Sequence, residues 1–168
     1  QLWINDGAGV FTLDQFTMGI DGGTHRTMSS AWGDMDLDGD LDLVLGGFGP
    51  HPAEPFGTSA DFVDADPVLL FENMGDGSFT DVSALLPPEI HGGYQSNVSW
   101  IDLDGDSRQD LIVFNNYGWA YPGTVVWNRV GGFETDDGSA GFSDAYGTFG
   151  VGLGDVNGDG FADFLRTG

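Results

Sequence analysis

Apolar residues occur along the chain in short runs of four to six, and the segments between them are rich in Gly, Asn and Asp. Short apolar runs bounded by such turn residues predict β-strands, whereas a helix would need a longer amphipathic period. We expect strands at residues 28–32, 41–45, 68–72, 96–101, 111–114, 124–127, 148–153 and 161–165. The pattern therefore predicts an all-β protein.

Two sequence markers recur along the chain. The first reads D-x-[DN]-x-D-x-x-x-D before an apolar run, and its copies begin at Asp34, Asp102 and Asp155. The second is an apolar run that ends in Asn before a glycine turn and a Phe, and its copies have Asn5, Asn73 and Asn128. Both markers advance by 68 positions between their first and second copies, from 34 to 102 and from 5 to 73. The shared spacing indicates an internal repeat.

Each repeat predicts four antiparallel strands. One strand precedes the acidic motif, one follows it, a third ends at the marker Asn, and a fourth begins near the next Phe. Four such strands in about 40 to 60 residues are typical of a β-propeller blade. The predicted division is a half blade 1–27, a blade 28–94, a blade 95–147 and a half blade 148–168. Faces between blades are expected to be filled by Trp32, Trp100, Trp119 and Trp127.

About three repeats are too few for a closed ring, since propellers usually have about 4 to 8 blades. We therefore expect this chain to be a segment of a larger propeller of about six to eight blades. The alternative is that additional copies join their half blades to close a ring. Either way, the first and last strands of one chain are not expected to pair.

The net charge is strongly negative, with 27 Asp and Glu against 4 Lys and Arg and a formal charge of −23. This balance excludes nucleic acid as a partner, because phosphate backbones are bound by clustered basic residues. No apolar run approaches the roughly 18 residues of a membrane span, so no membrane insertion is expected. The absence of Cys excludes disulfides and thiolate chemistry. The hydrophobic fraction of 40% is nevertheless high enough for a folded core.

The acidic motifs predict calcium sites. Carboxylates at positions 1, 3 and 5, a backbone carbonyl at position 7 and a carboxylate at position 9 supply the hard oxygens that Ca²⁺ prefers. Without a divalent cation, so many adjacent carboxylates would repel one another. The predicted ligands are Asp34, Asp36, Asp38, Asp40 (carbonyl) and Asp42; Asp102, Asp104, Asp106, Arg108 (carbonyl) and Asp110; and Asp155, Asn157, Asp159, Phe161 (carbonyl) and Asp163. We expect three ions, one per loop.

An EF-hand is excluded because its twelfth loop position must be Glu, and here Leu45, Val113 and Arg166 stand there. The alternative reading is that the acidic motifs are only solvated surface turns. Three copies of one ligand spacing favour the metal site.

The motifs resemble those of the FG-GAP or VCBS repeat family, calcium-loop β-propellers that include the head of integrin α subunits. Residues 149–160 are similar to the family signature, and residues 31–43 with 70–82 are similar to the subgroup of cartilage acidic protein and the bacterial ASPIC/UnbV proteins. Two positions depart from it: Leu37 and Ser107 replace glycines at loop positions 4 and 6. The resemblance implies a calcium-binding propeller used for adhesion, carbohydrate binding, scaffolding or, less often, catalysis.

The leading functional hypothesis is an extracellular calcium-stabilised propeller, secreted or on the cell surface, that acts as a binding, adhesion or structural module for a protein or glycan. Extracellular modules bind calcium at roughly 10⁻⁴ to 10⁻³ M, a concentration that the cytosol lacks. A lectin-like alternative would use Trp119 and Tyr121 to stack on sugar rings. A catalytic propeller is less favoured, because no His pairs with a nucleophile or with convergent acids outside the loops. We expect no enzymatic activity.

Overall fold

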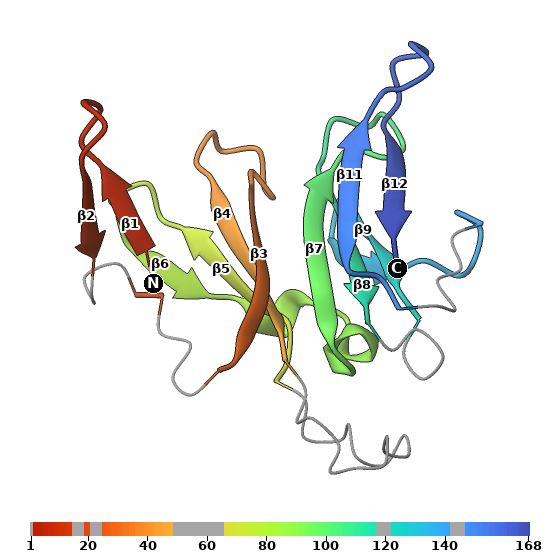
Figure 1. Ribbon diagram of the computed structural model, residues 1–168, viewed down its shortest axis with the longest axis horizontal. Coiled ribbons are helices and arrows are strands. Elements are labelled where there is room, and N and C mark those ends of the chain that lie inside the picture. Colours follow the sequence, from red (N-terminus) through yellow and green to blue (C-terminus); the bar gives the residue numbers. More distant parts are fainter. Residues whose placement is uncertain (1, 15–18, 21–24, 49–65, 117–121, 142–146) are drawn as a thin grey trace.

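The computed structural model describes residues 2–14, 19–20, 25–48, 66–116, 122–141 and 147–168, and within these the protein is almost entirely β-structure (Figure 1). The strands are β1 (Leu2–Asn5), β2 (Phe11–Asp14), β3 (Thr27–Gly33), β4 (Asp42–Gly47), β5 (Leu69–Asn73), β6 (Phe79–Asp81), β7 (Gln95–Ile101), β8 (Asp110–Asn115), β9 (Thr124–Arg129), β10 (Gly132–Thr135), β11 (Gly150–Gly154) and β12 (Asp163–Thr167). Two 3₁₀ turns, η2 (Ser83–Leu85) and η3 (Pro88–His91), connect β6 to β7. None of the described helices is long and apolar enough to cross a membrane.

The strands form two antiparallel four-stranded sheets and two antiparallel strand pairs. The sheets have the order β3-β4-β5-β6 and β7-β8-β9-β10, and the pairs are β1-β2 and β11-β12. This order confirms the predicted blades of four consecutive strands. The two pairs lie at opposite ends of the structure in Figure 1, and within the described residues no strand joins them into a closed propeller.

Each acidic motif forms the connection between the first two strands of its sheet. The paired residues that bracket the three loops are Gly33 and Asp42, Ile101 and Asp110, and Gly154 and Asp163. Position 9 of each motif is therefore the first residue of the second strand. The strand pairing fixes where every acidic loop begins and ends.

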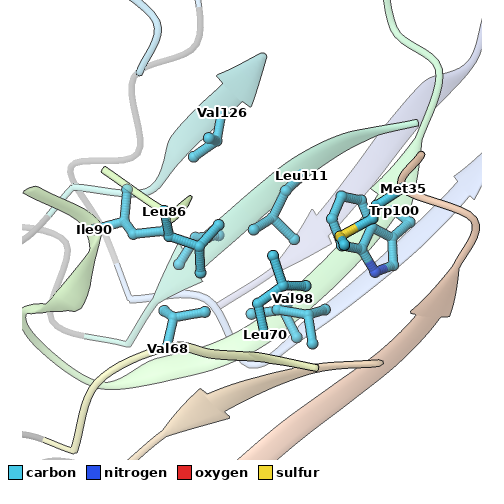
Figure 2. Packing of buried hydrophobic residues seen from close by; sticks show 11 residues of the cluster. Met35, Val68, Leu70, Leu86, Ile90, Val98, Trp100, Leu111 and Val126 are labelled. Carbon is cyan, nitrogen blue, oxygen red and sulfur yellow. The ribbon is translucent and has the colours of Figure 1, made fainter. Parts of the chain in front are cut away.

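The hydrophobic core lies between the two four-stranded sheets (Figure 2). Leu70 of β5 and Val68 just before it meet Val98 and Leu111 from the second sheet, and Ile90 of η3 lies at one end of the cluster. All six residues of β8 are buried, which agrees with the continuous apolar run 111–114. Burial of this core is the main stabilising contribution to the contact between the sheets.

The expectation for the tryptophans holds only in part. Trp100 is 8% exposed and packs in this core, as predicted. Trp32 is 43% exposed and lies against Phe79 of its own sheet, with ring centroids 5.9 Å apart. The reason is that Gly33 of the first sheet packs closely on Trp100, whereas no such neighbouring sheet covers Trp32 in the described part. Trp127 is half-buried, and Trp119 lies outside the described residues.

A buried glutamine also connects the two sheets. The Gln95 side chain accepts a hydrogen bond from the Gly47 N–H at 2.7 Å and donates one to the Gly92 carbonyl at 2.7 Å. The Ser29 hydroxyl donates to the Gln95 carbonyl at 3.0 Å. These bonds satisfy both ends of a fully buried amide and fix the distance between β4 and β7.

Candidate metal centres

The three acidic loops share one set of hydrogen bonds. The side chain at position 3 accepts from the N–H of position 5, at 3.2, 3.2 and 2.9 Å in the three loops. The side chain at position 5 accepts from the N–H of position 7, at 2.9, 2.8 and 2.9 Å. Oδ2 of the position 1 aspartate accepts from the N–H of position 6, at 3.2, 2.9 and 2.9 Å. These hydrogen bonds from backbone N–H groups to side chains curve each loop around one centre without any bound ligand.

Positions 4 and 6 have left-handed backbone in every loop. The φ values are 66° and 97° for Leu37 and Gly39, 79° and 73° for Gly105 and Ser107, and 76° and 90° for Gly158 and Gly160. Glycine adopts this conformation most easily, and loop three has glycine at both positions. The two departures from the family pattern, Leu37 and Ser107, keep the same backbone path as the glycines that they replace.

The position 9 aspartates of the first two loops are buried and hold the loop to the sheet. Asp42 accepts hydrogen bonds from the N–H of Met35 and from the N–H of Asn73, both at 2.8 Å. Asp110 accepts the equivalent pair, from position 2 of its loop at 3.0 Å and from Asn128 at 2.9 Å. Each of these aspartates therefore joins its loop to the marker asparagine at the end of the third strand.

Burial raises the pKa of both Asp42 and Asp110 above the ordinary value for aspartate. The backbone hydrogen bonds lower these pKa values in part, and the nearby charges of Asp36 and Asp38 raise that of Asp42 further. Negative charge at this position is therefore both desolvated and repelled by its neighbours. A bound cation would offset both effects.

The first loop brings Asp34, Asp36 and Asp42 together, with one carboxylate oxygen from each within 4.8 Å of the others. Oδ1 of Asp34 is buried and has no hydrogen-bond partner among the described residues. In the second and third loops the equivalent oxygen accepts from the glycine N–H at position 4, at 2.8 and 2.6 Å. Position 4 of the first loop is Leu37, which makes no such bond in the described structure. A buried, unpartnered carboxylate oxygen among three carboxylates fits a divalent cation.

The second loop brings Asp102, Asp104 and Asp106 together within the same 4.8 Å. It also contains a positive charge, because the Arg129 guanidinium forms an ion pair with Asp104 and lies 3.7 Å from the Asp106 carboxylate. The hydrogen bond from Arg129 lowers the pKa of Asp104. Both clusters can hold a metal ion, but only the second is already paired with a protein cation in the described structure.

The structure thus unites part of the predicted ligand set in the first and second loops. The groups of three carboxylates leave out Asp38 and Asp40 in the first loop and Arg108 and Asp110 in the second. In the third loop Asp155, Asn157, Asp159, Phe161 and Asp163 are all described, and their carboxylates form no comparable group of three. Asn157 there donates from Nδ2 to Asp159 at 3.0 Å. The carbonyl ligands and the third site stay predictions.

Direct contacts join the first and second loops. The Asp34 N–H donates to Oε1 of Gln109 at 2.9 Å, and Nδ2 of Asn128 donates to the Met35 carbonyl at 2.6 Å. Gly33 packs so closely that an added Cβ would lie 2.4 Å from Cγ of Trp100. The two candidate sites are therefore built partly from each other's repeat.

Sequence reasoning assigned no role to several of these residues. Asn73 and Asn128 were visible as repeat markers, although nothing in the pattern indicated that they bind position 9. Arg129 directly follows a marker in a chain with only four basic residues, which is a usable signal. For Gln109, the sequence contains no signal that would have indicated a role. Trp119 and Tyr121, the residues of the lectin hypothesis, lie outside the described part of the chain.

Comparison with protein families gives one match, to the FG-GAP-like repeat, at residues 56–113 and 102–165. The two copies together span more than half of the chain and include the second and third acidic loops. The first loop lies outside the matched residues but shares their hydrogen-bond pattern. Neither the curated proteins nor the solved structures yielded a match. The chain belongs to the FG-GAP-like repeat family.

Proposed function

We propose that this chain is part of a calcium-binding β-propeller in which the ions stabilise the acidic loops. The observation that carries the proposal is the buried Oδ1 of Asp34, which has no partner among the described residues and lies in a cluster with Asp36 and Asp42. A desolvated oxygen in a negative cluster is costly unless a cation binds it.

The donor set favours calcium over other divalent ions. Every candidate ligand is an oxygen, and Ca²⁺ accepts six to eight oxygens in irregular geometry, whereas Mg²⁺ retains several waters in a strict octahedron. Asp34, Asp36 and Asp42 would hold the ion in the first loop, and Asp38 and the carbonyl of Asp40 are the further predicted oxygens. The ion would supply positive charge that neutralises the cluster. In the third loop, the proposed site relies on the side-chain oxygen of Asn157.

The proposed role of the ions is structural. Each loop connects two strands of one sheet, and in the first two loops the position 9 aspartate binds the third strand as well. An ion at this point would fasten three strands of the blade, so its loss would loosen the blade locally. We therefore propose a binding, adhesion or structural module without enzymatic activity.

A calcium-rich medium is the setting that this proposal requires. Loops of this ligand type in extracellular modules bind at roughly 10⁻⁴ to 10⁻³ M, so we propose a secreted or cell-surface location and a protein or glycan partner. The acidic surface is compatible with neither nucleic acid nor an anionic membrane as that partner. We also propose that the chain belongs with the repeats of cartilage acidic protein and the ASPIC/UnbV proteins.

Isothermal titration of the chelator-treated chain with CaCl₂ tests the proposal. We expect two to three ions per chain and a clear rise in melting temperature, with a much smaller effect of MgCl₂ at the same concentration. Asp36→Asn should remove one ion, whereas the matched substitution Asp137→Asn, at an exposed aspartate outside the loops, should remove none. An absence of calcium binding at millimolar concentration would refute the proposal.

A further inference from the structure

The two candidate centres differ in their charged residues: position 7 is Asp40 in the first loop and Arg108 in the second, and Arg129 lies beside the second loop. The first loop contains five aspartates, and within the described residues no basic side chain pairs with them. The second contains four aspartates, and Arg129 forms ion pairs with two of them, Asp104 and Asp106. We propose, resting on the function proposed above, that Arg129 is a built-in counter-cation that competes with calcium in the second loop. The first loop consequently fills before the second.

The guanidinium also contacts an aromatic ring. Its carbon lies 4.8 Å from the centroid of the Trp127 ring, in the geometry of a cation–π contact. That ring is fixed in turn, because its Nε1–H donates to the Asp136 carboxylate at 3.0 Å. The backbone N–H of Asn128 is anchored on Asp110. Arg129 is thus presented to the loop by a rigid support.

The ion pair is accessible enough to exchange. The side chains of Arg129, Asp104 and Asp106 are 36%, 28% and 38% exposed. Partly hydrated pairs contribute little free energy, so a divalent ion can displace the arginine instead of being excluded. A guanidinium near the site still repels the incoming ion and occupies oxygens that the ion needs. The expected result is weakened calcium binding in this loop, not its loss.

The first repeat provides the natural comparison. Met74 follows Asn73 as Arg129 follows Asn128, so an uncharged side chain stands at the equivalent point beside the first loop. The substitutions Arg129→Met and Met74→Arg therefore test a charge difference that already exists between the two repeats.

A second difference between the loops acts in the same direction. Oδ1 of Asp34 is unpartnered in the described structure, whereas Oδ1 of Asp102 already accepts from the Gly105 N–H at 2.8 Å. The first loop therefore offers a free oxygen and no competing cation, and the second offers neither advantage. Repulsion by one additional positive charge at a partly exposed site corresponds to a change in calcium affinity of about tenfold.

The test is a calcium titration of the chelator-treated full chain followed by ¹⁵N–¹H NMR. The amide signals of Gly39 and Gly105 report the first and second loops separately. We expect the Gly39 signal to reach its midpoint at the lower calcium concentration. Arg129→Met should lower the Gly105 midpoint about tenfold, and Met74→Arg should raise the Gly39 midpoint similarly.

The control variant is Arg26→Met, which removes the same charge and also an ion pair, to Asp66, at a site away from the acidic loops. It should leave both midpoints unchanged. If the two signals respond to calcium but Arg129→Met and Met74→Arg leave the midpoints in place, the proposal for Arg129 is wrong and calcium binding stands. If neither signal responds, the proposed function itself fails. Because the two substitutions alter surface positions in different repeats, loss of fold in one variant leaves the other variant as the test.

Discussion

The side-chain amide of Asn128 donates a hydrogen bond of 2.6 Å to the backbone carbonyl of Met35, a residue 93 positions earlier in another sheet. Met35 is position 2 of the first acidic loop, and its own N–H binds Asp42. Its side chain is buried in the core against Trp100. The first loop is therefore shaped by residues of the second repeat through both a polar contact and packing.

Asn128→Ala should lower the free energy of unfolding by about 1–3 kcal/mol, because it leaves the buried Met35 carbonyl without a donor. The matched variant is Asn73→Ala, which removes two exposed bonds, from Nδ2 to the Leu41 carbonyl at 3.2 Å and from the Gly75 N–H to Oδ1 at 3.1 Å. Its cost should be nearer 0.5–1 kcal/mol. Urea unfolding of both variants gives the comparison, and equal losses would contradict the special role of Asn128.

Gly33→Ala should destabilise the protein by about 1–3 kcal/mol through overpacking. The new Cβ would lie 2.4 Å from Cγ of Trp100 and 2.5 Å from Oε1 of Gln109. Gly154 occupies the same position in the third repeat, and no atom of the described residues lies within 4 Å of an added Cβ there. Gly154→Ala should therefore change the melting temperature little. A large loss in both variants would show that the backbone, and not the neighbouring sheet, requires glycine here.

Asp36→Ala and Asp42→Ala should separate ion binding from folding. The exposed Asp36 accepts only from the Asp38 N–H among its described contacts, at 3.2 Å, so in chelator its loss should cost less than about 0.5 kcal/mol. Asp42→Ala leaves two N–H groups of the loop and β5 unsatisfied and should cost about 1–3 kcal/mol without any metal. Both should weaken calcium binding. Unfolding in EDTA and titration with calcium measure the two effects.

The Arg26–Asp66 pair predicts a defined pH dependence. Burial raises the pKa of Asp66, but hydrogen bonds and charge from Arg26 lower it more, so the pKa in the folded state lies below that in the unfolded state. The pair therefore stabilises the protein above the unfolded pKa of about 3.9, and this contribution disappears as the pH falls through the lower, folded value.

Asp66→Asn should consequently cost up to about 1 kcal/mol at pH 7, since the two side chains are 47% and 21% exposed. The difference from the unsubstituted protein should shrink when the pH is lowered from 7 to well below the unfolded pKa of about 3.9. Urea unfolding at the two pH values is the measurement. A difference of the same size at both would show that the charge of Asp66 is not what stabilises the contact.

The strands and the acidic loops were predictable because their signals are local. Apolar runs such as 111–114 and the alternating aspartates from Asp34 need only their immediate neighbours to be read. β11 begins two residues later than expected, and β12 begins and ends two residues later, since strand ends depend on pairing.

Contacts between repeats could not be predicted in this way. The bonds from Asp34 to Gln109 and from Asn128 to Met35 join residues 75 and 93 positions apart, and no periodicity encodes them. The exposure of Trp32 depends likewise on which faces another sheet covers. Arg129 was predictable only in part. Its closeness to the loop follows from the strand register, whereas its ion pairs require the folded sheet.

The left-handed backbone of Leu37 and Ser107 has a consequence for how such loops can be recognised. An L-residue in this conformation carries a strain of about 1–2 kcal/mol. Each of the first two loops contains one such residue and still follows the path of the third loop, which has glycine at both positions. A search motif that demands glycine at both positions would find only one loop of the three. Backbone torsion at these two points, more than residue identity, is the property that the loops have in common.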